Sequence, residues 1–256
     1  MARRTRRDRQ RFSINRLMVR IERAYQRALH LYMRETARQA SVHHDFMHVQ
    51  IAIHDRLPGL RDLIRDWMKR VVFLFGPPVI ESILGKSGGR APQTKDAIDI
   101  FTETVLGWLD DYALLQATTI SGTLTEIARQ ILIDAFNEGL GEDETASLLV
   151  DKVGGSIESA SRIARTEVHT AANIASDTAA RSTGLDMVKE WASTDDSRTR
   201  QSHRDADGQR REMDEPFSVG GSSLQFPGDP DGPAREVINC RCVALYHPRI
   251  NGQVFD

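Results

Sequence analysis

Residues 156–192 read SIESASRIARTEVHTAANIASDTAARSTGLDMVKEWA, and the spacing of their apolar residues changes partway through. Up to residue 181 the apolar side chains recur every three or four positions, which is the period of one buried helix face. Gly184 then provides a natural helix end, and residues 187–192 have the composition of a short strand. A long helix that is followed at once by a strand predicts an α+β unit in this part of the chain.

The sequence on either side of this segment extends the same contrast. Upstream, apolar residues keep the helical period, and helices are expected over residues 14–70, 97–118, 124–136 and 142–153. Downstream, turns rich in Asp, Gly and Pro separate strands that are expected at residues 209–213, 224–226 and 241–246. The predicted fold class is α+β, with a mostly helical N-terminal half, a long helix and a small C-terminal antiparallel sheet. Two regions are expected, a helical region over residues 1–120 and a smaller domain over residues 121–256.

The overall composition argues against a membrane protein or a disordered chain. Hydrophobic residues make up 40% of the chain and charged residues 27%, which is close to the average of soluble globular proteins. The most apolar stretch, residues 71–84, is interrupted by Gly76-Pro77-Pro78 and is shorter than the roughly 20 residues that a membrane-spanning helix needs. The N-terminus lacks the continuous apolar run of a signal peptide. The protein is therefore expected in the cytoplasm of the producing cell, without a membrane partner.

The formal net charge of −2 hides a strongly basic N-terminus. The first 27 residues contain ten arginines and only two acidic residues, Asp8 and Glu22. Arginine presents a planar fork of donors that suits phosphate groups, so this arm could bind nucleic acid or an acidic protein surface. The alternative is a solvated start of a helix, and the charge pattern does not separate the two. The candidate nucleic-acid contacts are Arg3, Arg4, Arg6, Arg7, Arg9 and Arg11.

Cys240 and Cys242 are the only cysteines of the chain, and in a strand their thiols would point to one face because side chains alternate. A disulfide between them is not expected, since extended i,i+2 residues lie near the upper limit of disulfide geometry. The two thiols could supply half of a tetrahedral structural zinc site, with His203 as a third ligand. The candidates for the fourth ligand are Asp195, Asp207 and His247. A lone Cys-x-Cys pair is a weak metal signal, so packing as small apolar side chains is the favoured alternative.

Residues 191–203, WASTDDSRTRQSH, are expected to leave a strand, pass an Asp-rich cap and enter a short helix. A catalytic interpretation would combine Asp195 or Asp196 with His203 as the acid–base or metal set of a nuclease. In a structural interpretation Asp195 caps the helix, while Arg198 and Arg200 pair with carboxylates or loop carbonyls. Neither a nucleophile nor a glycine-rich cofactor loop accompanies the segment, so the structural interpretation is favoured and no enzymatic activity is expected.

Several short motifs then follow one another in a distinctive order. They are IARTE at 163–167 with Asn173, a strand ending at Trp191, TDDSRTR at 194–200 with His203, DGQ at 207–209, DEPF at 214–217, FPGDP at 226–230 and VINCRC at 237–242. Together, over about residues 124–246, they resemble the C-terminal domain of the phage head-morphogenesis family that includes the Mu protein F-like minor capsid proteins. The signature residues of the resemblance are Arg165, Glu167, Trp191, Asp195, Asp196, Arg198, Arg200, His203, Gly208 and Asn239. Residues before about 120 are similar to the family only in their general sequence pattern.

The resemblance implies a component of the phage virion that is made in the host cytoplasm and is present in few copies. It implies a place at the portal vertex or the inner head, with portal or capsid protein and possibly phage DNA as partners, and with no small-molecule substrate. It implies no catalytic residues. The alternative is an enzyme, either the nuclease with His203 and Asp195 or Asp196, or an effector domain joined to the module. The chain ends at Asp256, fourteen residues after Cys242, so no effector domain is expected.

Two charged residues of the long helix, Arg165 and Glu167, are expected to lie within one turn that faces the small sheet. A buried network of Arg165 with carboxylates would fix how the helix and the sheet pack together, because unpaired buried ions cost several kcal/mol each. This network is predicted to serve stability and not turnover.

Overall fold

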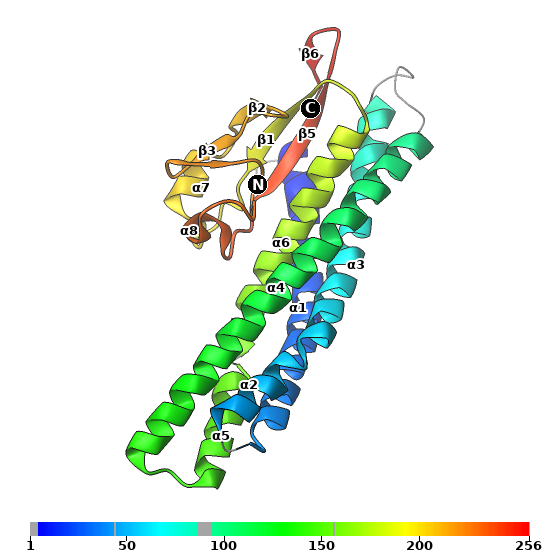
Figure 1. Ribbon diagram of the computed structural model, residues 1–256. Helices are drawn as coiled ribbons and strands as arrows, with labels where there is room; N and C mark the ends of the chain where they lie inside the picture. Colours follow the sequence, from blue (N-terminus) through cyan, green and yellow to red (C-terminus); the bar gives the residue numbers. More distant parts are fainter. Residues whose placement is uncertain (1–4, 44, 87–93, 156, 256) are drawn as a thin grey trace. The chain divides into compact units, whose positions relative to one another are not determined.

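The computed structural model describes residues 5–43, 45–86, 94–155 and 157–255 (Figure 1). The described residues form two compact units, each assembled from separated segments. Unit 1 takes its residues from segments 1–22, 68–107 and 165–256, and unit 2 takes its residues from segments 23–67 and 108–164. The boundary predicted near residue 120 lies inside a helix, and a division of roles between residues 1–120 and 121–256 stays a prediction.

Helices account for most of the described chain up to residue 182. They are α1 (Arg6–Ala40), α2 (Phe46–His54), α3 (Leu57–Lys86), α4 (Thr94–Glu138), α5 (Glu142–Val153) and α6 (Ile157–Ser182), followed later by the short α7 (Gln201–Asp205) and α8 (Ala234–Val237). The strands are β1 (Met187–Ala192), β2 (Arg210–Glu212), β3 (Phe217–Val219), β4 (Ser222–Leu224), β5 (Val243–Ile250) and β6 (Gln253–Val254). The predicted α+β class is thereby confirmed, including the mostly helical N-terminal half.

Helix α3 runs through Gly76-Pro77-Pro78, where the sequence indicated an interruption. Proline has a φ angle near the helical value, but inside a helix it removes a backbone donor and its ring clashes with the carbonyl four residues earlier, at a cost of about 3 kcal/mol or more. Gly76 has a separate role, since a Cβ atom there would lie 2.1 Å from Cζ of Phe101. The glycine lets the buried Phe101 ring lie directly against the backbone of α3, and this packing overrides the local preference.

The helix boundaries differ from the prediction at two other places. Residues 14–70 form parts of three helices and not one, and Asp45 begins α2 by accepting a hydrogen bond of 3.1 Å from the backbone N–H of His48. The helices expected over residues 97–118 and 124–136 are joined into the single helix α4.

The C-terminal sheet is antiparallel, with strand order β2-β1-β5-β6. In the β1–β5 pair Trp191 lies opposite Ala244, and all six residues of β1 are buried. Residues 187–192 form the strand that the sequence predicted, whereas β5 begins at residue 243 and extends to residue 250. The hairpin β3–β4 was not predicted; its two-residue turn, Gly220-Gly221, has positive φ at both glycines, as a tight hairpin of this kind requires.

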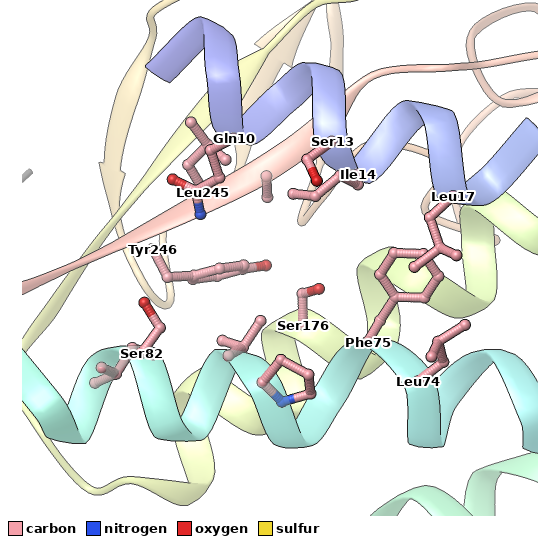
Figure 2. Close-up of a pocket in the computed structure, with 14 residues that line it drawn as sticks. Gln10, Ser13, Ile14, Leu17, Leu74, Phe75, Ser82, Ser176, Leu245 and Tyr246 are labelled. Carbon is pink, nitrogen blue, oxygen red and sulfur yellow. The ribbon is translucent and has the colours of Figure 1, made fainter. Parts of the chain in front are cut away.

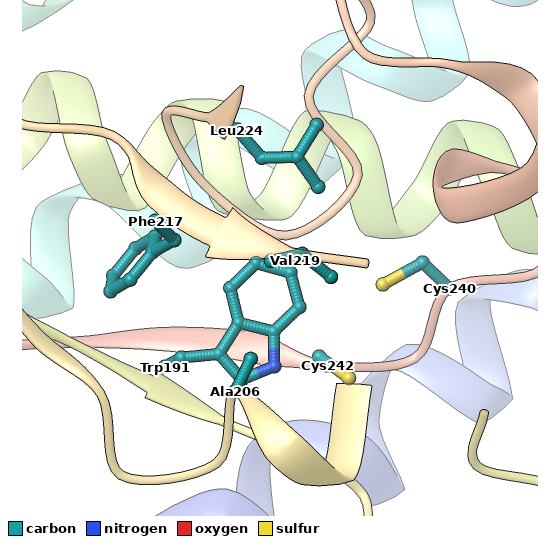
Figure 3. Close-up of a cluster of buried hydrophobic side chains, with 7 residues drawn as sticks. All are labelled: Trp191, Ala206, Phe217, Val219, Leu224, Cys240 and Cys242. Atoms are coloured by element: carbon teal, nitrogen blue, oxygen red, sulfur yellow. The ribbon is translucent and has the colours of Figure 1, made fainter. Parts of the chain in front are cut away.

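Two apolar clusters hold the sheet in unit 1. In one cluster, Trp191 packs with residues of the β3–β4 hairpin and of the segment that leads into β5 (Figure 3). The other cluster joins Ile83 of α3 and Ala180 of α6 to Met187 and Tyr246 of the sheet. The residues that the sheet contributes to the two clusters, Met187, Trp191, Ala244 and Tyr246, share one face of the β1–β5 pair. Segments distant in sequence complete the core on that face. Unit 2 has its own core, which includes the buried residues Tyr25, Leu29, Ile64 and Leu109.

Candidate functional site

Helix α6 positions the segment that carries the two cysteines. Asn239 adopts a left-handed backbone with φ of 61°, a conformation that asparagine tolerates better than most residues. Its backbone N–H donates to the hydroxyl of Thr166 at 3.1 Å, and its side-chain oxygen accepts from Nη1 of Arg165 at 2.9 Å. Further along α6, the amide of Asn173 donates to the carbonyl of Cys242 at 3.2 Å. The turn and the start of β5 are thus fixed to one face of α6.

The segment before α7 is organised by Asp196. Its carboxylate accepts two hydrogen bonds from the guanidinium of Arg241, at 2.5 and 2.7 Å, and one from the backbone N–H of Arg198 at 2.9 Å. The contact with Arg241 holds the pKa of Asp196 well below its usual range. The pair links the entry of α7 to the residue between the two cysteines, so it brings the His203 helix and the Cys240–Cys242 segment together.

His203, Cys240 and Cys242 form a buried cluster at this junction. Nδ1 of His203 lies 3.4 Å from Sγ of Cys242 and 3.7 Å from Sγ of Cys240, and the three potential ligand atoms lie within 4.8 Å of one another. Each of the three residues is 2% exposed, which leaves no room for a bulky substrate. The other ring nitrogen, Nε2, lies 3.1 Å from Oε2 of Glu236, which also accepts a hydrogen bond of 2.8 Å from the hydroxyl of Ser202. Sequence reasoning grouped the histidine with the thiols but missed Glu236.

The electrostatics of the cluster favour a negative charge on sulfur. A hydrogen bond from the Cys242 thiol holds the pKa of Cys240 well below its ordinary value, and the same shared proton raises the pKa of Cys242. Burial lowers the pKa of His203, but the neighbouring Cys240 sulfur outweighs it, so the net shift is upward. A thiolate next to an imidazole is the donor set that soft metal ions prefer.

None of the three candidates for a fourth metal ligand joins the cluster. Oδ1 of Asp207 accepts from the backbone N–H of Ser193 at 2.7 Å and from Arg7 at 2.8 Å. Nε2 of His247 lies 3.4 Å from Oε2 of Glu190. Asp195 is exposed and has a positive φ of 53°. Among the described residues, the possible metal ligands that converge are the histidine and the two cysteines.

The structure corrects the predicted role of Asp195 and separates the proposed nuclease residues. The N-cap of α7 is Arg200, without a side-chain cap, and the residue that organises the preceding turn is Asp196 and not Asp195. The Asp196 carboxylate is bound by Arg241, whereas the His203 ring faces the thiols and Glu236. The aspartates and the histidine therefore do not form the set that a metal-dependent nuclease would need.

The other signature residues serve the same framework. Gly208, with φ of 76°, donates its N–H to the carbonyl of Trp191 at 2.8 Å, and Trp191 is completely buried. Nη2 of Arg200 donates to the carbonyl of Ile238, while the exposed Arg198 lies 3.6 Å from Asp196. Each of these contacts fixes a turn around the sheet.

The network around Arg165 is anchored on α1, a partner that the sequence did not indicate. Nε of Arg165 lies 3.4 Å from Oε2 of Glu22, and the other oxygen of Glu22 lies 2.9 Å from Nε2 of His169. Glu22 and His169 are both buried, and so is Glu167, as predicted. The network connects α6 to α1 and to the Asn239 turn, which lies shortly before β5.

The structure divides the N-terminal arginines into two groups. Arg7 donates to Glu190 at 2.5 Å, to Asp207 at 2.8 Å and to the carbonyl of Trp191 at 3.1 Å. Arg11 donates to the carbonyl of Ser193 at 2.8 Å. These two predicted DNA contacts are therefore used inside unit 1. Arg9 is exposed, whereas Arg3, Arg4 and the side chain of Arg6 lie outside the described residues.

Further along α1 the exposed arginines fall on one face of the helix. They are Arg9, Arg16, Arg20, Arg23, Arg27, Arg34 and Arg38, and this set is called the arginine face below. At 3.6 residues per turn, their spacing confines them to an arc of about 60°. The acidic residues of α1, Asp8, Glu22 and Glu35, fall outside that arc. The arginine face is thus a continuous basic stripe along one helix.

Unit 1 also carries an apolar groove of about 400 Å³ (Figure 2). It is lined by Ile14 and Leu17 of α1, Phe75 of α3 and Tyr246 of β5, among others, and no charged side chain lines it. The polar groups of its wall are the amide of Gln10 and the hydroxyls of Ser13, Ser82, Ser176 and Tyr246. The groove is therefore mainly an apolar surface, with hydroxyl and amide groups at single points.

These observations define a small α+β module in which a polar framework on one helix fixes a sheet and a buried thiol–imidazole cluster. Residues 126–245 match the family described as phage Mu protein F-like, which is the family that the ordered motifs resemble. The family indicates a role in phage head morphogenesis and an association with the virion.

Two curated relatives share part of the sequence. An NAD(+)–arginine ADP-ribosyltransferase of Enterococcus faecalis is 31% identical over 126 residues, which cover 47% of this chain and 26% of that protein. The uncharacterized protein YqbB of Bacillus subtilis is 27% identical over 148 residues, which cover 56% of this chain and 48% of that protein. The chain thus spans about a quarter and about half of the lengths of these relatives. No solved structure matches the chain. Within the described residues, no helix combines the length and the apolar character needed to cross a bilayer.

Proposed function

We propose that the protein is a minor head protein that acts in assembly at the portal vertex or the inner head, and that it contacts phage DNA through the arginine face. The family supports the head assignment, and the arginine face carries the DNA contact. Six of its seven members have no ion-pair partner among the described residues, since Arg38 alone lies near a carboxylate, 3.7 Å from Glu35. A row of unneutralised guanidinium groups attracts a polyanion without reading its sequence.

The rest of the molecule supports binding in place of catalysis. The signature residues are engaged in internal contacts, Asp196 with Arg241 and Arg165 with Asn239 among them. The thiol–imidazole cluster is buried, and the groove of unit 1 has no charged lining. A portal or capsid partner would bind an exposed surface of the same chain, with the DNA contact confined to α1.

The DNA contact is tested with the full-length protein and a labelled DNA duplex at several salt concentrations. Replacing Arg16, Arg20, Arg23 and Arg27 by Gln should weaken binding and flatten the salt dependence, by about 0.9 in slope for each phosphate that is no longer neutralised. The matched control replaces four exposed arginines elsewhere, Arg61, Arg129, Arg198 and Arg235, with the same change in net charge. An equal reduction of binding in both variants would overturn the assignment of DNA contact to the arginine face.

The assembly role has its own test, in phage particles. The protein should be found in purified heads at a low copy number relative to the major capsid protein, and particles made without it should be malformed or should fail to package or release DNA. Normal, infectious heads without the protein would contradict the assignment. A variant of the arginine face that binds DNA normally but is missing from heads would assign this face to a protein partner.

A further inference from the structure

We propose that His203, Cys240 and Cys242 bind a structural zinc ion, through Nδ1 of the imidazole and the two sulfurs. This inference is independent of the proposed function. It rests on the distances within the cluster, on the groups that surround it and on the chemistry of its donors. A purely apolar packing of the two cysteines would explain their burial, but it would not explain an imidazole nitrogen that faces both sulfurs.

The distances fit a tetrahedral ion without rearrangement. Zinc binds cysteine sulfur at about 2.3 Å and histidine nitrogen at about 2.0–2.1 Å, which in a tetrahedron places nitrogen and sulfur roughly 3.5–3.6 Å apart. The two nitrogen–sulfur distances here are 3.4 and 3.7 Å, on either side of that value. Both nitrogen–sulfur distances therefore match those around one ion, and all three ligand atoms lie within 4.8 Å of one another.

The ring nitrogen that faces away from the thiols has the partner expected of a metal-bound histidine. Such a histidine usually donates its second N–H to a carboxylate, which fixes the tautomer and the ring orientation. Glu236 occupies this position, at 3.1 Å from Nε2, and Ser202 in turn donates to it. The turn of the β3–β4 hairpin approaches the same carboxylate, since a Cβ atom on Gly220 would lie 2.5 Å from Oε1 of Glu236. When Nε2 carries the proton and donates it to Glu236, Nδ1 is unprotonated, and its lone pair faces the two sulfurs.

A buried donor at the cluster also lacks an ordinary partner. The indole nitrogen of Trp191 is buried and makes no hydrogen bond of normal geometry within the described part of the chain. It faces Cys242 (Figure 3), where a sulfur that carries negative charge would accept its N–H. A zinc thiolate supplies such a charge. His203, Cys240 and Cys242 supply three of the four tetrahedral positions of such an ion.

The donor set selects zinc over the common hard cations. Thiolates and imidazole suit zinc, whereas magnesium and calcium prefer oxygen ligands. The site is enclosed by Trp191 and the apolar residues Phe217, Val219 and Leu224, which places the ion inside the core of the module. It would join α7 to a segment 37 residues further along the chain. The ion would therefore act as a cross-link in a region with few regular elements.

The first test measures the metal content of the full-length protein, expressed with zinc in the medium and purified without chelator. We expect about one zinc ion per chain, removed only by strong chelation and with a lowered melting temperature. Replacement by Co²⁺ should give the sulfur-to-cobalt charge-transfer absorption of a thiolate site, and the two cysteines are the only ones in the chain. A folded protein that is free of zinc and gives no such absorption with Co²⁺ would overturn the proposal.

Variants assign the ligands. Zinc should be lost in the double variant Cys240→Ser, Cys242→Ser and in His203→Gln, but not in the matched control His54→Gln, which changes an exposed histidine. Glu236→Gln should keep the site but weaken its zinc affinity by about 10- to 100-fold, because the carboxylate positions the imidazole. Zinc retained by the double cysteine variant would also overturn the proposal. If that variant does not fold, the cobalt spectrum of the unaltered protein decides whether the cysteines bind a metal ion.

Discussion

Two successive charged residues, Lys189 and Glu190, are buried on opposite faces of β1. Nζ of Lys189 donates to the carbonyl of Met213 and to the backbone and side-chain oxygens of Gln225, at 2.9–3.0 Å. Burial still lowers the pKa of Lys189 to about 8. A charge on this strand is therefore tolerated only because each face supplies several partners from segments that are distant in sequence.

Glu190 makes the stability of the protein sensitive to acid. Burial would raise the pKa of Glu190, but hydrogen bonds from His247, Arg210 and Arg7 outweigh it and lower the pKa from 4.5 to about 2. Between these two pH values the unfolded chain takes up a proton that the folded chain does not. The stabilisation, on the order of 3 kcal/mol, is therefore complete above pH 4.5 and disappears as the pH falls towards 2.

Urea unfolding of the unaltered protein and of Glu190→Gln, measured from pH 6 to pH 2.5, tests this effect. The difference in unfolding free energy between the two proteins should shrink steadily as the pH falls, because glutamine has no proton to gain. A difference that stays constant over this range would show that the Glu190 carboxylate does not titrate with a lowered pKa.

Arg165 is expected to matter for stability, through its contacts with Asn239 and Glu22. Arg165→Ala removes the donor that holds the left-handed Asn239 turn and leaves Glu22 with His169 as its nearest partner. We expect a decrease of about 1–3 kcal/mol in unfolding free energy. The control is Arg20→Ala on the exposed face of α1, which should change stability by less than about 0.5 kcal/mol. A melting temperature unaffected by Arg165→Ala would refute this role.

At the scale of elements, α3 shows how packing overrides local sequence signals. Gly76→Ala does not weaken the intrinsic preference of this position for a helix. It does place a Cβ atom against the buried ring of Phe101. We expect a decrease in unfolding free energy of about 1–3 kcal/mol, measured by thermal or urea unfolding. Gly107→Ala is the matched control, because this exposed helical glycine has no atom near an added Cβ, and alanine should stabilise α4 by about 0.5–1 kcal/mol. Similar effects of both changes would argue against the close packing at Gly76.

The sequence predicted well those elements whose first and last residues are determined by local sequence signals. Helix α5 and strand β1 have the predicted bounds, since glycines flank the first and a change of apolar period marks the second. The β3–β4 hairpin was missed because its strands have three residues each, too few to show a period. The course of α3 through Gly76-Pro77-Pro78 was not predicted, because a contact with Phe101 of another helix contributes to the conformation there.

The candidate site was predictable only in part, for a related reason. The spacing of Cys240 and Cys242 indicates two thiols on one face, and His203 is the nearest histidine that precedes them. Glu236 could not be recognised as a partner of the histidine, because it is an ordinary surface-type residue in the pattern of its short helix. The contact of Arg7 with Glu190 joins residues 183 positions apart, and no local pattern encodes such a pairing.

At the scale of the whole molecule, the family match and the folded unit do not have the same limits. The match begins at residue 126, whereas unit 1 also takes residues from segments 1–22 and 68–107. Helix α1 supplies Arg7 to Glu190 and Glu22 to His169, and α3 supplies Ile83 to the cluster with Met187 and Tyr246. Residues 126–245 therefore lack part of the core and of the charge partners of the module to which they belong.

A chain divided between α4 and α5 tests this dependence. We expect the fragment 141–256 alone to melt at a lower temperature and with less cooperativity than the full chain, because Met187, Tyr246 and the Glu190 carboxylate are then without their partners from α1 and α3. Co-expression with the fragment 1–140 should restore the melting transition and yield a complex that co-purifies. A first fragment that carries Arg7→Gln and Glu22→Gln should associate more weakly, since both residues contact the second fragment in unit 1. If the fragment 141–256 alone melted like the full chain, the N-terminal helices would be dispensable for the stability of the family domain, and their role would be confined to binding.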